Sequence, residues 1–507
     1  MSSESHAPTM LAPVWRTRLF ALAGTVLAIA LGVEVANESF LWPAIGLGAL
    51  AAIVLIRVQP LPLPTLLLGG AMFGYIVGNR GFAQLSLTSG FPLLPAEFVL
   101  LVGGALLLVQ SAWRRELPVR RDALNAALLL WMLYGTARLA FGLRMHGFTA
   151  IRDYALVYYA GFFFLAQHAA RESASARFLQ RTVVGACLVL LIVHPLVAQF
   201  PAFFAGNLTL RGAPLIFFKD DLAGNFMSVG ALLCFVRYEA TRRTAWLAVS
   251  LALAGLMLTT NSRSSMVGLA LGALWLGLVG RWRFAGTLAV GAIMAAVAIF
   301  VVAELRNDSW RQTPLHRIYE RVASIADPLG QRTYATEDAF KGDNNIFRLV
   351  WWRTAVEEAL ETNHWFGLGF GHDLAARFVR EYLPEATEEF SARSPHNVLI
   401  TVFARMGIVG AGLFLAVIGA LTARVWRALR QPEITFNAGA CGLAAWVLLA
   451  CACFGVVLEG PMGAVVFWTL LGLAQPQAHH QEESAPAADR LLPADAADRE
   501  VAPTSVP

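Results

Sequence analysis

The chain has 507 residues, of which 57% are hydrophobic and 14% are charged, and its mean hydropathy is +0.58. About 25% of the residues of a soluble domain are charged, so this composition excludes a soluble globular protein and indicates a helical membrane protein. The net charge of +5 comes with arginines gathered at the ends of apolar runs, which is typical of membrane topology and gives no reason to infer nucleic-acid binding.

Apolar runs recur along the chain, at the length of about 20 residues that a helix needs to cross a hydrocarbon core. Backbone groups in lipid must bond to one another, so each run is expected to be a helix. We predict an all-α polytopic fold with about 12–14 transmembrane helices. The predicted spans are 19–36, 40–57, 62–79, 94–112, 123–142, 151–170, 179–200, 221–236, 244–260, 262–279, 284–303, 396–423, 436–457 and 460–475.

These spans divide the chain into five parts. Residues 1–18 form an N-terminal segment, 19–303 hold helices 1–11, and 396–475 hold helices 12–14. Between them lies a polar segment, 304–395, which we expect to be one long loop containing short helices. The tail 476–507 is rich in Ala, Pro, Asp and Glu, cannot bury a core and is expected to be disordered.

Arginine positions predict the orientation, because Lys and Arg next to helix ends stay on the cytoplasmic side. The opposite set of connections is sparse in cations, and it includes 304–395. Both termini are therefore expected in the cytoplasm and the 304–395 segment on the outer side of the membrane. The arginines on the predicted cytoplasmic side are Arg57, Arg114, Arg115, Arg120, Arg121, Arg171, Arg177, Arg181, Arg237, Arg242, Arg243, Arg281, Arg283, Arg424, Arg427 and Arg430.

The N-terminal segment shows no small-residue cleavage site, so the first span is expected to remain as an anchor. All five cysteines fall inside predicted spans and none has a histidine at ligand spacing, which indicates packing residues. No phosphate-binding loop is present, and we expect neither a metal nor a cofactor.

Three polar sites on the predicted outer side are candidates for function. The first surrounds Arg263, where Asn261 or Ser262 can cap the helix that follows. The first N–H groups of that helix would then point outward beside the guanidinium, which is the arrangement of an anion site. The alternative is an arginine that snorkels to the lipid interface.

The second site is Arg348, which shares a face with Trp351 and Trp352 on an amphipathic helix expected from Asn344 to Glu361. A helix lying on the membrane surface would show the same pattern. Nearby carboxylates at 357, 358, 361 and 373 raise the possibility of a glycosidase pair, but solvated helix faces explain them better.

The third site is His396, in the sequence Ser394-Pro395-His396-Asn397. Ser394 suits an N-cap and Pro395 the first helical position, so His396 is expected in the first turn of a helix. A helix N-terminus disfavours positive charge, and this predicts a neutral, proton-accepting imidazole near pH 7. A capping or interface histidine is the alternative.

Two further groups are weaker candidates. Asp220 and Asp221 suggest a metal ligand pair, but their place at the start of a predicted helix favours capping. Arg138, Arg152 and Arg211 are possible substrate contacts, and buried ion pairs or interface anchoring explain them equally well.

The order and spacing of these features resemble the O-antigen ligase family, over residues from about 261 to 421. The family includes O-antigen polymerases and protein-glycosylating ligases as well as ligases. The features that carry the resemblance are Arg263 after a serine, Arg348 three residues before Trp351, Gly367-Leu368-Gly369-Phe370-Gly371, His396-Asn397 and Gly407-Ile408-Val409-Gly410.

The resemblance implies an inverting, metal-independent glycosyl transfer at the periplasmic face of the inner membrane. The donor would be a glycan on undecaprenyl diphosphate, and in a ligase the acceptor would be lipid A core. By similarity, Arg263 and Arg348 bind the diphosphate and His396 activates the acceptor hydroxyl. Possible further contacts are Arg211, Ser262, Trp351 and Asn397.

The residues favour the same chemistry on physical grounds. A diphosphate leaving group needs a divalent metal or fixed cations, and guanidinium forks supply the second. A sugar hydroxyl needs a base, which a neutral histidine provides. Alternatives of another class are a transporter or lipid flippase, which would show broken helices near mid-membrane, and a noncatalytic scaffold, which leaves 304–395 unexplained.

Overall fold

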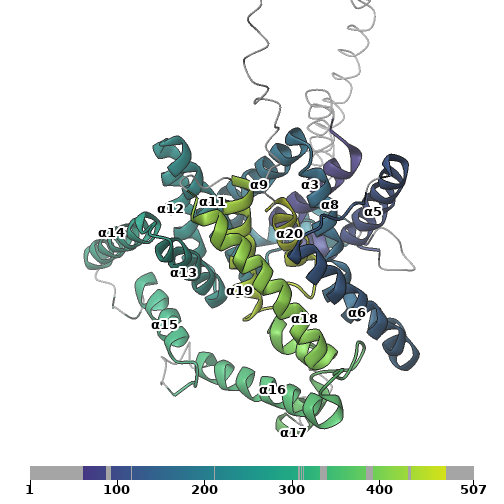
Figure 1. Cartoon of the computed structure of the whole chain (residues 1–507). Coiled ribbons are helices and arrows are strands. Elements are labelled where there is room, and N and C mark those ends of the chain that lie inside the picture. Colours follow the sequence, from purple (N-terminus) through teal and green to yellow (C-terminus); the bar gives the residue numbers. More distant parts are fainter. Residues whose placement is uncertain are drawn as a thin grey trace, which may run out of the picture.

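The computed structural model describes residues 61–86, 93–115, 117–210, 212–306, 309, 311, 313–331, 340–383, 392–431 and 436–474 (Figure 1). Apart from one hairpin of two-residue strands, β1 (Thr209–Leu210) and β2 (Ala213–Pro214), its regular structure is helical. In chain order the helices are α3 (Leu63–Val77), α4 (Arg80–Ala83), α5 (Pro95–Arg114), α6 (Ala123–His146), α7 (Phe148–Tyr158), α8 (Gly161–Ala169), α9 (Ser173–Gln199), α10 (Pro201–Gly206), α11 (Asp220–Thr241), α12 (Thr244–Thr259), α13 (Arg263–Leu278), α14 (Arg283–Arg306), α15 (Pro314–Ala326), α16 (Phe340–Asn363), α17 (Ala376–Tyr382), α18 (Val398–Leu429), the π-helix η4 (Phe436–Cys441), α19 (Gly442–Ala452) and α20 (Pro461–Leu473).

The predicted helical, multi-pass membrane fold is confirmed. Within the described residues, five helices are long and apolar enough to cross a membrane, namely α5, α6, α9, α14 and α18. Shorter apolar helices accompany them: α3, α12, α13, Ala438–Ala452 and α20. The spans expected at 19–36 and 40–57 and both terminal segments lie outside the described residues, so the total of about 12–14 remains a prediction.

The interior of the bundle is built on α11, α19 and α20, which are buried along most of their length. Helix α11 packs against α9, α12, α13 and α19, whereas α20 packs against α3, α8 and α19. Figure 1 shows α5, α6 and α14 on the outside. An apolar 18-residue stretch of α14 has no buried residue, as expected of a surface in contact with lipid. Because α11, α19 and α20 are buried, the positions of their ends and of the loops that follow them are fixed.

The single helix expected over 151–170 is wrong, because the chain forms α7 and α8 with a turn at Tyr159 and Ala160. The hydroxyls of Tyr158 and Tyr159 both donate to Oε1 of Glu97, at 2.9 and 2.6 Å. Adjacent residues of an α-helix point about 100° apart, so two neighbours reach one carboxylate most easily where the helix breaks. At 11 residues, α7 is too short to span, and it places Arg152 and Asp153 near the functional site.

The helix expected to begin at residue 396 begins instead at Val398, so the prediction that Ser394 caps it is wrong. Asn397 is the N-cap, and its side chain accepts from the backbone N–H groups of Leu399 and Ile400 at 3.0 and 3.2 Å. His396 has a φ of 58°, outside the helical range, and therefore lies in the loop before the helix.

Helix α18 also breaks at Gly407, which has a φ of 67°. A Cβ at this position would overlap the Trp365 backbone, so only glycine fits. The glycine-rich segment 367–371 and the residues just before it pack into this break: Leu368 N donates to Ala404 O at 2.7 Å and Ile408 N to His364 O at 2.9 Å. The exposed backbone groups of the broken helix are thereby satisfied.

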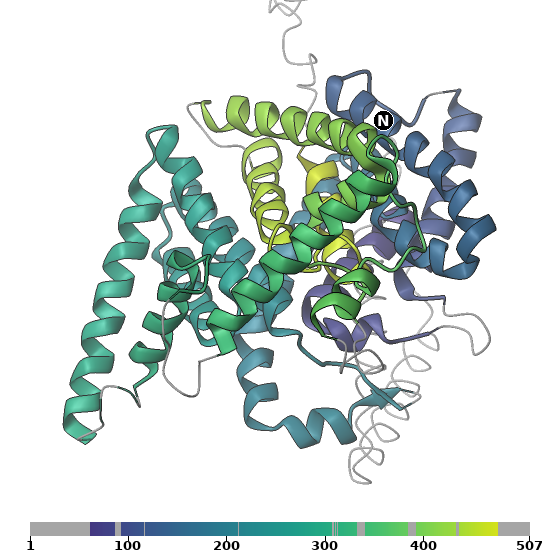
Figure 2. The same ribbon diagram turned by 90° about the horizontal axis from the view of Figure 1, so that it is seen from below.

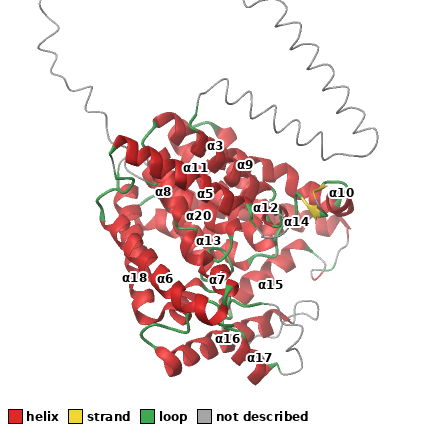
Figure 3. Ribbon diagram, turned by 90° about the vertical axis from the view of Figure 1, so that its right-hand side faces the viewer, coloured by secondary structure: helices red, strands yellow, loops and turns green. Residues whose placement is uncertain are grey.

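The polar segment 304–395 contains α15, α16 and α17. These helices lie at one end of the bundle, and α16 runs across that end (Figures 1 and 2). Figure 3 shows α16 and α17 at the same end from the side, away from the β1–β2 hairpin. Helix α16 has 24 residues and begins at Phe340, four residues before the predicted start.

Candidate functional site

The N-terminus of α13 is anchored by a serine network. As predicted, Ser262 caps the helix, and its hydroxyl accepts from Ser265 N at 3.2 Å. The hydroxyls of Ser264 and Ser265 share the side-chain oxygen of Asn225 on α11 as an acceptor. The start of α13 is therefore fixed against the buried helix α11. The backbone of Arg263, the first residue of α13, is held in place by the same contacts.

The Arg263 side chain connects three helices. Its Nη1 donates to Ser324 Oγ on α15 at 3.0 Å and to Asn345 Oδ1 on α16 at 2.7 Å. The Asn345 amide in turn donates to the carbonyls of Ser324 and Asp327, at 3.0 and 2.8 Å. Arg263 is thus not a cation snorkelling into lipid but part of the contact between α13 and the polar segment.

A second arginine on α15 holds the loop that precedes Arg263. Arg321 donates to the carbonyls of Leu258 and Thr260 at 2.9 and 2.7 Å, and to Asn261 Oδ1 at 2.7 Å. Carbonyls at a helix C-terminus lack intrahelical partners, and a guanidinium satisfies several of them at once. Helix α15 therefore locks the end of α12 and the turn into α13.

Arg348 on α16 reaches from the polar segment to the bundle, where its Nη1 donates to Phe454 O at 3.0 Å just beyond α19. Arg348 and Arg263 line one cavity of about 310 Å³, which we call the Arg348 cavity. Its polar wall is completed by Ser264, Ser324 and Asn345. Its apolar wall consists of Val267, Ile325, Pro328, Leu349, Trp352 and Phe454.

The loop that carries His396 is held by α16. Trp352 Nε1 donates to Pro395 O at 2.6 Å, and the ring of Trp351 meets the imidazole edge-on at a centroid distance of 6.0 Å. Ser394 Oγ accepts from His396 N at 3.3 Å. The backbone of Ser394 also hydrogen-bonds to the imidazole, whereas among the described residues no side chain does, so one ring nitrogen is available to a substrate.

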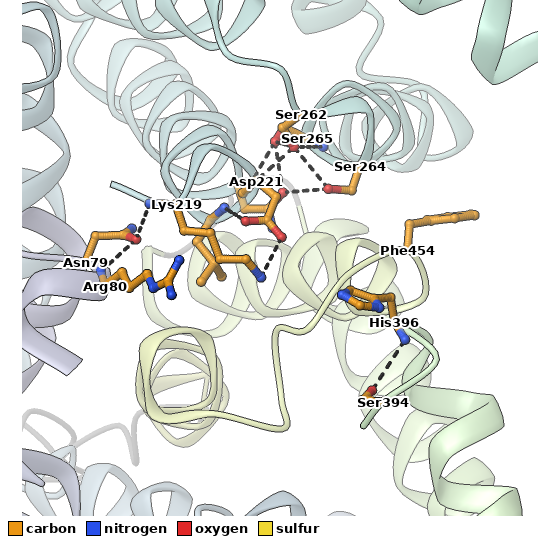
Figure 4. Close-up of polar contacts among 12 residues, drawn as sticks. Asn79, Arg80, Lys219, Asp221, Ser262, Ser264, Ser265, Ser394, His396 and Phe454 are labelled. Carbon is orange, nitrogen blue, oxygen red and sulfur yellow. Dashed lines mark hydrogen bonds and ion pairs between the residues drawn. The ribbon is translucent and has the colours of Figure 1, made fainter. Parts of the chain in front are cut away.

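The electrostatics of His396 favour a neutral imidazole. Burial and the positive charges of Arg348 and Lys219 together lower its pKa from 6.5 to about 4, although Asp221 and the Ser394 backbone oppose them. Figure 4 shows Lys219 and Asp221, at the start of α11, on the side toward which His396 faces. The neutral state agrees with the sequence prediction, but its cause is burial and neighbouring cations and not a position in the first helical turn.

Asp220 and Asp221 occupy the first turn of α11, as predicted for residues that favour the helix dipole. Asp221 Oδ1 accepts from Leu222 N at 2.9 Å, and its Oδ2 pairs with Lys219 Nζ at 3.2 Å. In the part of the chain that the structure describes, no three His, Cys, Asp or Glu side chains are placed to share a metal ion.

Residues 247–415 match the model of a known protein family, which is described as O-antigen ligase. This segment matches an O-antigen ligase family domain. The match covers about a third of the chain and includes Arg263, Arg348 and His396, so the family resemblance predicted from these features is confirmed. The comparison with curated proteins gives no match.

Three other candidate contacts of the O-antigen ligase domain have structural partners. Ser262 and Asn397 cap α13 and α18, and Trp351 is buried with its Nε1 donating to Leu374 O at 2.8 Å. Trp351 also stacks on Phe378, so α16 packs against α17 on this face and does not rest there on a membrane surface. Arg211 lies outside the described residues.

The carboxylates weighed as a glycosidase pair are engaged with basic neighbours. Glu357 pairs with Arg353 at 2.7 Å, Glu358 contacts His372 at 2.9 Å, and Glu361 pairs with Arg377 at 2.7 Å. Asp373 accepts from Ala375 N at 3.0 Å. The first contact lies within α16, the second joins α16 to the turn after it, and the third joins α16 to α17. These carboxylates therefore stabilise the packing of the polar segment and do not form a glycosidase pair.

A second cavity lies beside His396, and of its other residues only Arg152 was singled out as a candidate from the sequence. It measures about 220 Å³, and we call it the Arg393 cavity; its ionisable residues are Arg152, Asp153, Arg393, His396, Arg405 and Glu459. Arg405 lies within the apolar helix α18, where a charge is costly unless it is paired or used. This cost of a charge within an apolar helix is the sequence feature that could have identified Arg405 as a functional candidate. Glu459 lies in the connection between α19 and α20.

Proposed function

We propose that this protein is an inverting, metal-independent glycosyltransferase that moves a glycan from undecaprenyl diphosphate to an acceptor hydroxyl. The most specific form of the proposal is an O-antigen ligase, whose acceptor is lipid A core. The proposal uses the family match over 247–415 together with the geometry around His396.

The observation that carries the proposal is that Arg263 and Arg348 line one cavity while a neutral His396 lies close enough to Arg348 for its charge to lower the imidazole pKa. A diphosphate gathers negative charge as it departs, and preorganised guanidinium groups stabilise that charge without a metal. The apolar wall of the Arg348 cavity suits the first isoprene units of a lipid carrier.

In the proposed reaction, His396 accepts the proton of the acceptor hydroxyl as its oxygen attacks the anomeric carbon. The bond from that carbon to the diphosphate oxygen breaks on the opposite face, so the configuration inverts. The electron pair leaves with undecaprenyl diphosphate, held by Arg263 and Arg348. The proton on His396 then passes to water.

The position of the arginines supports a periplasmic site. Asp221 lies at the N-terminal end of α11, and Arg242 follows its C-terminal end. In the same way, Arg263 lies at the N-terminal end of α13, and Arg281 follows its C-terminal end. Arg281 Nη2 donates to Gln431 O at 2.6 Å, so the C-terminal ends of α13 and α18 meet. The candidate site and the predicted cytoplasmic arginines therefore lie at opposite ends of the same helices.

Deletion of the gene in the source strain tests the function and separates ligase from polymerase. For a ligase we expect intact polymer that is no longer attached to lipid A core on a gel of surface glycans. A core bearing a single repeat would instead identify a polymerase. An unchanged glycan profile with altered uptake of a solute would contradict both and support a transporter.

Chelation is expected to leave the reaction intact. Full-length purified protein incubated with EDTA should transfer glycan within about twofold of its untreated rate, because guanidinium groups replace the metal at the leaving group. The measurement is product formation with and without EDTA, followed by added Mg²⁺. A rate that collapses with EDTA and returns with Mg²⁺ would contradict the proposed role of Arg263 and Arg348.

A further inference from the structure

The Arg393 cavity combines three guanidinium groups with two carboxylates, and both carboxylates are already engaged. Asp153 Oδ2 accepts from Arg405 Nη1 at 2.8 Å and from Gly371 N at 3.0 Å. Glu459 Oε1 accepts from Thr401 Oγ1 at 2.9 Å. The acidic residues of the cavity are therefore committed to holding its walls.

The cationic groups of the cavity have hydrogen-bond donors that are not used by the protein. Arg393 Nη2 donates to Gly371 O at 2.9 Å, but its nearest carboxylate contacts, with Asp153 and Asp373, are long at 3.7 and 3.9 Å. Its Nε is buried without a hydrogen-bond partner. Arg152 is exposed at the rim, and no described residue pairs with it. Buried donors are normally satisfied, so an open donor on Arg393 points to a ligand.

The cavity also has a defined relation to the proposed reaction. His396 lines it, and Arg348, in the neighbouring cavity, affects the same imidazole. If the diphosphate of the donor occupies the Arg348 cavity, a second substrate in the Arg393 cavity would lie against His396. An acceptor must be placed in this way for its hydroxyl to lose a proton to His396.

We infer that the Arg393 cavity binds the acceptor and that Arg152 and Arg393 select an acceptor carrying an acidic group, a phosphate or a carboxylate, near the attacking hydroxyl. This inference rests on the proposed function. Guanidinium forks bind both kinds of oxyanion through paired hydrogen bonds, whereas a neutral sugar would leave Arg152 without a counterion and Arg393 with only its two long carboxylate contacts. Arg152 and Arg393 are substrate-binding residues in this proposal, not members of the proton-transfer step.

The test compares acceptors that differ in charge, with full-length protein in lipid nanodiscs and undecaprenyl-diphosphate-linked glycan as donor. The acceptors are intact lipid A core, the same glycolipid after phosphatase treatment, and the same glycolipid with its carboxylates reduced. We expect Arg152→Gln and Arg393→Gln each to raise the acceptor KM about 10- to 100-fold with intact lipid A core, with kcat much less affected. The treatment that removes the recognised group should raise the wild-type KM similarly and abolish the difference between wild type and variants.

Arg380→Gln is the matched control. Arg380 is an exposed arginine of α17, and it belongs to neither the Arg348 cavity nor the Arg393 cavity. Its KM is expected to stay at the wild-type value. Because Arg393 contacts Asp153 and its loss can affect folding, Arg152→Gln is the decisive variant, since its side chain has no partner to lose among the described residues.

Direct binding separates this inference from the proposed function. Intact lipid A core is expected to bind wild-type protein about tenfold or more tightly than Arg152→Gln, even in the absence of donor. Equal dissociation constants for the two proteins, or an equal wild-type KM for charged and neutralised acceptors, would overturn the inference. Absence of glycan transfer by the wild type with every acceptor would instead refute the proposed function.

Discussion

Replacement of His396 by alanine is expected to slow glycan transfer about 10²- to 10⁴-fold while the protein remains folded in the membrane. Among the described residues no side chain hydrogen-bonds to the imidazole, so its removal breaks only its contacts with the Ser394 backbone and the Trp351 ring. The acceptor hydroxyl would then have to lose its proton to water. The measurement is the single-turnover transfer rate of purified protein, with thermal unfolding in detergent as the test of folding.

The pH profile of the wild type follows from the same histidine. A base must be unprotonated to accept a proton, so transfer falls as the pH drops through the pKa of His396. Since burial, Arg348 and Lys219 lower this pKa to about 4, kcat/KM is expected to be level across the neutral range and to fall only near pH 4. An unperturbed histidine would produce the fall near pH 6.5.

His364→Ala is the matched control for His396→Ala. His364 is exposed after the end of α16, and only its backbone carbonyl contributes to the α18 break. Its removal should leave the rate within about twofold of the wild type. Wild-type rates in His396→Ala would refute the role of His396 as the base, and a fall in wild-type kcat/KM near pH 6.5 would refute the account of its environment.

The helical fold could be predicted because the bilayer imposes it: a long apolar run in lipid has to be a helix. The breaks in the helices could not be predicted from the sequence. The turn at Tyr159 depends on Glu97, which lies 62 residues earlier on another helix, and the break in α18 depends on the 367–371 turn packing against Gly407. Apolar periodicity does not report such contacts, because they join segments that are distant in sequence.

The candidate site divides in a similar way. Arg263 and Arg348 could be singled out because charged residues in an apolar chain are costly, and they do line one cavity. The neutral state of His396 was predicted from a helix position it does not occupy; its φ of 58° places it before the helix. The Arg393 cavity draws on α7, α18 and the connections before α18 and after α19, so its composition emerges only from the fold.

Replacement of Arg348 by alanine is expected to reduce transfer about 10²- to 10³-fold, equivalent to about 2.7–4 kcal/mol of transition-state stabilisation. The guanidinium is half-buried, and its hydrogen bond to Phe454 O fixes its direction. Its positive charge would attract the negative charge that develops on the departing diphosphate. Arg348→Lys should recover only part of the rate, because a point charge cannot form the fork of hydrogen bonds. Transfer rates with saturating donor and acceptor measure the effect.

Arg353→Gln is the control on the same helix, since its side chain is 78% exposed and pairs only with Glu357 among the described residues. Arg348→Gln provides a second, independent readout. Loss of the positive charge removes one cause of the low pKa of His396, so the acid fall of the residual activity should move upward from about pH 4 toward 6.5. A reduced rate with an unmoved acid fall would mean that Arg348 acts on the leaving group without influencing the base. An unchanged rate would remove Arg348 from the mechanism altogether.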